Sequence, residues 1–348
     1  MAEPRVSSAG RGAGRLAWLK AHPILCLALL TPGLPEYLSS SSPLLNLVAN
    51  PAWFFLGLAL NVGQYTGGAL LIREAAIRWH KGWATVAFLG LAYGVTEEGL
   101  GDNTLFNSCH GADGLLGHFG RFDGVNWVWS AGVLTLHVVV SIGLALLLFG
   151  LALPSSRGRS LLGRRGIVTC FATLAAATGV EALLVRSVDG FWMGVPLFVG
   201  ALLVIVVLVA VARVVPASWG RPPAAPPTAA PSVLVAAGLL LFPAVFVAES
   251  VPAALPDGAA VALVAVIGIV AAFLETVRRT IGVDDGHRRA CLALGLVVFL
   301  AGFGLLESLP FAYTLPLAVL ALWFVVRLER AYRPRPAIVP GTAAGGTG

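Results

Sequence analysis

Long apolar runs separated by short basic loops constrain this chain more than any other feature. Ten segments are apolar over the roughly 20 residues that a helix needs to cross the hydrocarbon core of a bilayer. Only 11% of the 348 residues are charged and the mean hydropathy is +0.86, whereas a soluble domain carries roughly 25% charged residues. We therefore expect an all-α fold, a polytopic transmembrane helix bundle. The ten expected spans are roughly 21–38, 52–72, 82–101, 126–152, 166–184, 193–213, 232–248, 259–274, 290–308 and 311–327.

The basic residues indicate how these helices are oriented. With the N-terminus inside the cell, 21 of the 23 Lys and Arg residues fall on the cytoplasmic side, and only Arg121 and Arg186 fall outside. This bias follows the positive-inside rule of membrane proteins. The sequence therefore predicts about ten spanning helices, N-in and C-in, in a cell (plasma) membrane. The same bias explains the net charge of +6, so the expected partner is the lipid bilayer and no nucleic acid.

The chain is expected to divide by polar content. Residues 1–20 are predicted to be a cytoplasmic N-terminal segment, and residues 21–153 to form four helices that bear the polar residues. Residues 154–335 are predicted to form supporting helices five to ten, with a Pro- and Ala-rich cytoplasmic linker at 216–231. Residues 336–348 are predicted to be a disordered tail. The composition, rich in Ala, Gly and Val with Arg in place of Lys, is typical of a GC-rich bacterial genome.

The third predicted helix carries two adjacent glutamates. Gly90, Gly94, Glu97 and Gly101 share one helical face, and Glu98 lies beside it. Small residues on such a face let another helix approach closely. An ionisable group that faces lipid costs several kcal/mol, so both glutamates are expected to point into the bundle or into a cavity.

The neighbouring helices add polar groups at a similar depth. Asn61 and Gln64 lie on one face of the second helix, and Asn126 and His137 on one face of the fourth. His137 is the only histidine deep within a predicted span. At 1.5 Å per residue, the two glutamates lie roughly 8 Å and His137 roughly 12 Å below the outer boundary. A Glu–His cluster in the outer half of the bilayer is therefore geometrically allowed.

Further acidic residues fall near the outer ends of the helices. Glu36 is expected to line the same cavity as Asn61, Gln64 and Asn126. Glu181 and Glu249 are expected to be ordinary polar residues of helix ends. The outer loop after the third helix adds several polar groups, which are Asp102, Asn107, Cys109, His110, Asp113 and His118.

The pair Glu97-Glu98, followed by a histidine in the next helix, resembles the CAAX-prenyl-protease and bacteriocin-processing family of membrane proteases. That family has EExxxR, then FxxxH, then a late histidine followed by Asn or Asp. The resemblance implies that paired glutamates and histidines on neighbouring helices activate a water molecule for peptide hydrolysis. Here Asp102 stands where the motif has arginine, and Val133 where it has phenylalanine. His287, the last histidine, is expected in a cytoplasmic loop.

Two further resemblances involve the same region. The chain is similar to the PrsW-type membrane proteases, which share an intramembrane glutamate pair and a later histidine. Residues 31–150 are most similar to a family of uncharacterised multi-pass bacterial and archaeal membrane proteins, which implies no specific activity. The stretches that carry this last resemblance are TPGLPEYLSSSSPLL, GGALLIREAAIRWHKGW, AYGVTEEGL and GVNWVW.

Three function classes stay open at this point. In an intramembrane hydrolase acting on a membrane peptide, Glu97 or Glu98 would be the general base for water and His137 a ligand or an acid. A divalent metal such as zinc would take these three side chains as ligands, although adjacent side chains on an α-helix diverge by about 100°. A proton- or cation-coupled transporter would use the same groups as a relay. A non-catalytic membrane scaffold would use them only for interhelical hydrogen bonds.

Overall fold

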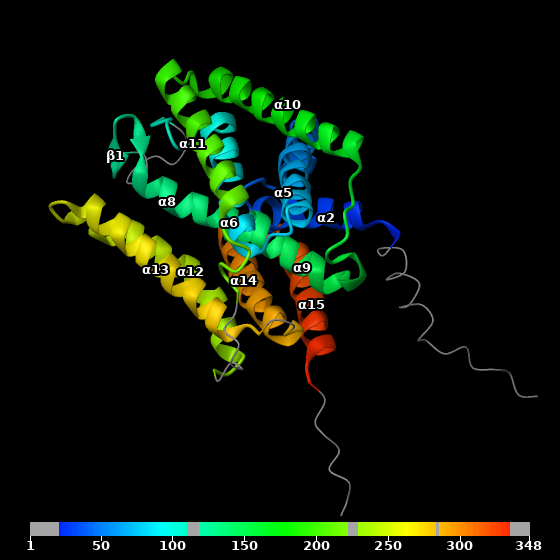
Figure 1. Ribbon diagram of the computed structural model, residues 1–348. Coiled ribbons are helices and arrows are strands. Elements are labelled where there is room, and N and C mark those ends of the chain that lie inside the picture. Colours follow the sequence, from blue (N-terminus) through cyan, green and yellow to red (C-terminus); the bar gives the residue numbers. More distant parts are fainter. Residues whose placement is uncertain (1–20, 110–117, 222–228, 283–284, 335–348) are drawn as a thin grey trace, which may run out of the picture.

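The computed structural model describes residues 21–109, 118–221, 229–282 and 285–334 (Figure 1). Of these described residues 77% are helical, which confirms the all-α helical bundle expected from the sequence. The predicted N-terminal segment and C-terminal tail, the middle of the 216–231 linker, and the loop residues His110 and Asp113 lie outside the described residues.

Helices account for nearly every described element. Those of the first half are α2 (Pro23–Pro32), α3 (Asn46–Ala49), α4 (Pro51–Asn61), α5 (Gly67–Arg78), α6 (Trp83–Gly94), α8 (Trp127–Leu136) and α9 (Ala145–Ala152). Four π-helical segments continue them, namely η1 (Gly33–Leu38), η2 (Val62–Thr66), η3 (Val95–Gly101) and η4 (His137–Leu144). The second half holds α10 (Arg164–Asp189), α11 (Val195–Val214), α12 (Ser232–Ser250), α13 (Gly258–Thr280), α14 (Gly286–Glu307) and α15 (Leu315–Tyr332), with short 3-10 turns at η5 (Pro154–Ser156) and η6 (Val251–Ala254).

Seven helices among the described residues are long and apolar enough to cross a membrane, and each coincides with a predicted span. The two that follow the linker, Ser232–Ala254 and Gly258–Thr280, have 23 residues each and are longer than the sequence indicated. The other three predicted spans are less apolar or shorter: Pro23–Leu38 is a short apolar helix, Trp83–Gly101 contains the two glutamates, and Leu315–Tyr332 contains three charged residues. The helices are thus compatible with a multi-pass membrane protein.

The helix formed by α8, η4 and α9 runs through the middle of the molecule (Figure 1). It is the most buried of the seven, with 67% of its apolar stretch inside the protein, against 11% for α10 and for α11. Val140 and Leu144 belong to a core cluster shared with α12, α14 and α15, whereas Ile142 and Phe149 belong to a second cluster shared with α2, α5 and α6. Because this helix is packed on opposite faces, a polar group on it has to find its partners within the protein.

Close helix contact explains the small residues of the third predicted span. A Cβ added to Gly94 would lie 3.2 Å from His137 Cβ, and one added to Gly90 would lie 3.4 Å from Val138 Cα. The two glycines therefore let α6 pack tightly on η4. This confirms the predicted helix-contacting face and sets how close the glutamates come to His137.

A short hairpin precedes α8. Its strands are β1 (Arg121–Phe122) and β2 (Val125–Asn126), paired antiparallel. Asp123 and Gly124 form the two-residue turn, and both have positive φ. An Asp-Gly pair is a preferred sequence for a two-residue hairpin turn in which both residues have positive φ. The hairpin leads directly into α8.

Candidate functional site

Four π-helical segments meet around one cluster of polar side chains. Glu36 lies on η1, Tyr65 on η2, Glu97 and Glu98 on η3, and His137 begins η4. π-Helical segments are rare and occur frequently at functional sites. Because four helices that pack together each contain one here, this cluster is the candidate site.

The carboxylates of Glu97 and Glu98 converge on His137. Glu97 Oε2 and Glu98 Oε1 each lie 2.8 Å from His137 Nε2, and all three side chains are buried. The expected divergence of about 100° applies to an α-helix. Both glutamates reach the same nitrogen because η3 is a π-helix, which has more residues per turn and so rotates less at each residue. The structure thus brings together the three residues that the sequence analysis singled out for chemistry.

The two carboxylates compete for one ring nitrogen, because an imidazole nitrogen carries at most one hydrogen. Glu98 Oε1 is hydrogen-bonded to His137 Nε2, and Glu97 Oε2 has no other side chain or backbone group as a hydrogen-bond partner among the described residues. Ligand atoms of the three side chains lie within 4.8 Å of one another. The ligand atoms of a tetrahedral zinc site are about 3.3 Å apart, so small movements of these side chains would bring them to that spacing. Carboxylate oxygen and imidazole nitrogen are both zinc ligands, and three protein ligands leave a fourth position for water. The residues present therefore fit a divalent cation.

A hydrogen-bonded chain extends from Glu97 to the helices that contain η1 and η2. The Tyr65 hydroxyl lies 2.9 Å from Glu97 Oε1 and 2.6 Å from Glu36 Oε1. Ser42 donates to Glu36 Oε2 at 2.7 Å and accepts from Asn61 Nδ2 at 3.1 Å. Two predicted cavity residues, Glu36 and Asn61, are thereby linked to the glutamate–histidine cluster. Tyr65 and Ser42 complete the link, and the sequence analysis did not single them out.

Other side chains hold His137 and Glu98 in place. Glu98 Oε2 accepts from the Thr104 hydroxyl. Ser141 Oγ lies 3.2 Å from His137 Nδ1, one helical turn along the same span. The His137 ring also makes an edge contact with the Tyr93 ring, at 5.7 Å between centroids. Hydrogen bonds to the far nitrogen of an imidazole fix its orientation, so Nε2 is directed at the two carboxylates.

A carboxylate from α10 extends the cluster. Gln64 Nε2 donates a hydrogen bond to Glu181 Oε2, and a Cβ added to Gly101 would meet both side chains. The sequence analysis treated Glu181 as an ordinary helix-end residue, but the structure places it against a predicted site residue. No local pattern pairs residue 181 with residue 64, because the contact arises from the packing of α10 on η2.

Asn126 lies apart from this cluster. Its side-chain oxygen accepts from the Trp129 backbone N–H and so caps α8. By the helical rise it lies roughly 16 Å along the axis from His137. The structure therefore gives Asn126 the role of a helix cap, although the sequence analysis expected it to line the cavity. An asparagine directly before an apolar helical run is a preferred N-cap, and that signal was present in the sequence.

The cluster contains more acidic than basic groups. Glu36, Glu97 and Glu181 form no ion pair with Lys or Arg within the described ranges. A buried charge is tolerated only when it is paired, coordinates a metal, or is neutralised by a proton. Protons or a metal cation are therefore the partners that this cluster requires.

A second group of ligand-type side chains lies between α14 and α15. His287 Nε2 is 2.9 Å from Glu329 Oε1 and 3.9 Å from Cys291 Sγ. Arg333 also contacts Glu329 Oε1, at 2.9 Å, so the carboxylate already has a cationic partner. The sequence analysis expected His287 in a loop, whereas the structure places it in the first turn of α14. We interpret this group as an interhelical ion pair, and it provides an internal comparison for metal binding.

The position that differs most from the protease motif is Asp102, directly after η3. This aspartate is partly buried, and burial together with the nearby carboxylates of Glu98 and Glu97 raises the pKa of Asp102 well above its usual value. An acid that holds its proton more tightly than usual thus stands where the motif has arginine.

Comparisons with family models, with curated proteins and with solved structures found no match.

Proposed function

We propose that this chain is a membrane-embedded, metal-dependent hydrolase of membrane peptides, in which Glu97, Glu98 and His137 hold one divalent cation. The observation that carries the proposal is the convergence of two buried carboxylates on one imidazole nitrogen, each at 2.8 Å. Zinc is the cation whose usual ligands match this set. Glu97 Oε2, whose only polar contact among the described residues is with His137, is the atom that a bound cation would satisfy.

Other residues of the site would position the metal ligands and transfer protons. A bound cation would supply a Lewis acid and a water of lowered pKa. Tyr65 donates to Glu97 and holds its carboxylate in place, while Thr104 does the same for Glu98. Glu36 shares the Tyr65 hydroxyl with Glu97, so it is placed to take up and return a proton during turnover.

We also propose that the chain crosses the cell membrane ten times, with both ends in the cytoplasm. The three helical segments beyond the seven long apolar ones would cross as well, and the distribution of 21 of 23 basic residues supports this. The low hydropathy of Trp83–Gly101 has a local cause, since its two glutamates are buried against His137 and do not face lipid. In this topology the candidate site lies in the outer half of the bilayer.

A proton- or cation-coupled transporter is the second candidate. It is favoured by the carboxylates of buried Glu97 and of partly buried Glu36 and Glu181, which come from three different helices and have no Lys or Arg partner within the described ranges. Such a chain of acidic groups is typical of proton relays in membranes. A pH-gradient response in proteoliposomes that Glu97→Gln removes would support this candidate, and a flat response across many solutes would count against it.

The hydrolase proposal is tested by peptide cleavage in proteoliposomes. Wild type, Glu98→Gln and His137→Ala are compared on a set of membrane peptides, with Glu249→Gln as the matched control. Glu249 is equally buried but packs against Gly132, away from the site. We expect cleavage by wild type and by Glu249→Gln, and loss of cleavage in the two site variants while all four remain folded. Undiminished cleavage by Glu98→Gln and His137→Ala would overturn the proposal.

A further inference from the structure

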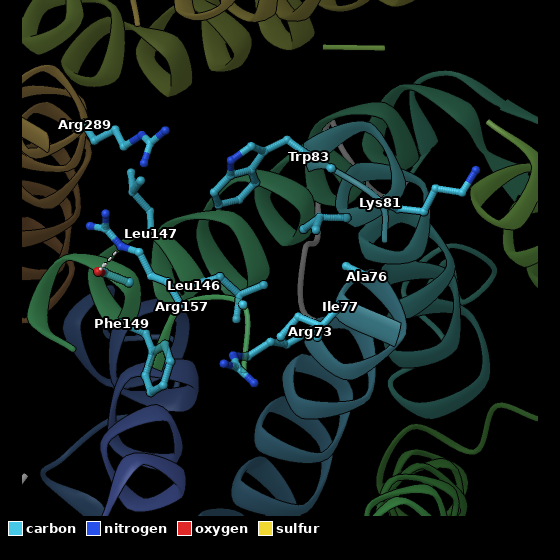
Figure 2. Close-up of a pocket in the computed structure, with 14 residues that line it drawn as sticks. Arg73, Ala76, Ile77, Lys81, Trp83, Leu146, Leu147, Phe149, Arg157 and Arg289 are labelled. Atoms are coloured by element: carbon cyan, nitrogen blue, oxygen red, sulfur yellow. Dashed lines mark hydrogen bonds between the residues drawn. The ribbon is translucent and has the colours of Figure 1, made fainter. Parts of the chain in front are cut away.

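A pocket of about 310 Å³ is separate from the glutamate–histidine cluster and shares none of its residues. It lies between the end of α5, the start of α6, the end of α9 and the first turn of α14 (Figure 2). Its volume is within the range of sites that bind small molecules. In the proposed topology these helix ends lie at the cytoplasmic boundary of the membrane.

Cations surround one part of this pocket. Of its 14 lining residues, four are basic and none is acidic. Figure 2 shows Arg73, Arg157 and Arg289 around the space, although these three arginines come from separate parts of the chain. The fourth cation, Lys81, donates to the Val215 carbonyl. The concentration of positive charge favours an anionic ligand.

The arginines differ in how firmly they are held. Arg73 is buried, pairs with Glu74 at 3.2 Å and donates to the carbonyl oxygens of Ser156 and Arg159. It is therefore a fixed part of the wall. Arg157 donates only its Nε–H to the Gly150 carbonyl, and it has no carboxylate partner in the described part of the chain. Its remaining N–H groups form the planar fork that binds phosphate oxygens.

Apolar side chains form the other part of the pocket. Ile77, Val86, Leu146 and Leu147 line it together with Trp83, whose side chain is about half exposed. A free phosphate ion would use the cations and leave these surfaces unoccupied. A phospholipid offers both a phosphate for the arginines and acyl chains for the apolar wall.

We propose that this pocket binds the headgroup phosphate of an anionic phospholipid. Basic pockets between helices on the cytoplasmic side are suited to such headgroups. The proposal relies on the proposed topology for the membrane depth of the pocket and is independent of the proposed hydrolase activity.

Native mass spectrometry of the full-length protein tests the proposal, with phosphatidylglycerol, phosphatidylcholine and inorganic phosphate as probes. Arg157→Gln, Arg289→Gln and the double variant are compared with Arg330→Gln, which removes an exposed cation of α15 outside the pocket. We expect wild type and Arg330→Gln to prefer phosphatidylglycerol over phosphatidylcholine. The double variant should lose affinity for phosphatidylglycerol roughly thirtyfold.

Several outcomes would overturn this proposal. Equal binding of the two lipids by wild type would do so without any variant, and so would undiminished phosphatidylglycerol binding in a folded double variant. Displacement of phosphatidylglycerol by inorganic phosphate at equal concentration would show that the site recognises phosphate alone. Arg157→Gln keeps the proposal testable if the double variant does not fold, because Arg157 is exposed and makes a single hydrogen bond.

Discussion

The hydroxyl of Tyr65 lies 2.9 Å from Glu97 Oε1 and at the same time 2.6 Å from Glu36 Oε1. A hydroxyl group has a single proton, so it donates to one carboxylate at a time. The other contact needs a proton on that carboxyl group. Tyr65 therefore couples the protonation of Glu36 to that of a candidate metal ligand, and its hydroxyl is a direct target for mutation.

Tyr65→Phe should weaken metal binding without unfolding the protein. The variant keeps the ring, which packs on His137 and Tyr93, and it removes only the hydroxyl that contacts Glu97 and Glu36. Loss of a hydrogen bond to a metal ligand typically lowers metal affinity 10–100-fold, and we expect about that loss in a zinc competition titration. Tyr332→Phe is the matched control, because it removes one hydroxyl hydrogen bond to the Leu151 carbonyl. Equal zinc affinity in wild type and Tyr65→Phe would contradict the role of the hydroxyl.

Gly94→Ala should destabilise the fold. The added methyl would lie 2.8 Å from Leu134 Cδ2 and 3.2 Å from His137 Cβ, so α6 would be pushed away from η4. Such overpacking costs about 1–3 kcal/mol and should lower the thermal midpoint measured in detergent. Gly268→Ala on α13 has nothing within 4 Å of the new methyl and should leave the midpoint unchanged or raise it. A midpoint for Gly94→Ala at or above that of wild type would show that the close contact is not rigid.

Arg73→Ala should cause a larger loss of stability. It leaves the buried Glu74 with fewer partners and frees the carbonyl oxygens of Ser156 and Arg159. Removing one member of a buried ion pair costs about 3–5 kcal/mol. Arg278→Ala serves as the control, because its partner Glu275 is exposed, and we expect no measurable change there. Similar thermal midpoints for the two variants would contradict the structural role of Arg73.

Asp102→Asn should stabilise the protein in a pH-dependent way. Burial and the carboxylates of Glu98 and Glu97 raise the pKa of Asp102 above 3.8 in the folded state. The folded state therefore binds its proton more tightly than the unfolded state, and stability falls as the pH rises through this range. The neutral asparagine avoids that loss, so its advantage over wild type in thermal midpoint should be small near about pH 4 and should grow towards neutral pH. An advantage that does not change with pH would contradict the raised pKa.

The sequence predicted the helical architecture and allowed the central cluster because both depend on local patterns. Apolar length located the seven long apolar helices, and the glycine spacing around Glu97 identified the face that contacts the next helix. Similar depths of Glu97 and His137 made their contact geometrically possible, and the two side chains are in contact in the structure. The chemical role of these residues stays a prediction.

The remaining site residues could not be predicted from local patterns. Glu98 also reaches His137 because η3 is a π-helix. No periodicity in the sequence indicates that this segment is π-helical. Glu181 joins the site through the packing of α10, more than 100 residues from its partner Gln64. Tyr65 was within reach of the analysis, because it lies four residues after Asn61 and so on the same face of that span.

The metal content of the detergent-purified protein tests the central claim most directly. Wild type, Glu98→Gln, His137→Ala and Cys291→Ser are each purified after zinc supplementation and measured by elemental analysis alongside their thermal midpoints. Cys291→Ser controls for the second ligand-type group at His287 and Glu329. We predict close to one zinc per chain in wild type and Cys291→Ser, and none in the two site variants. A folded wild type without bound metal, or metal that is lost in Cys291→Ser but kept in His137→Ala, would contradict the proposed site.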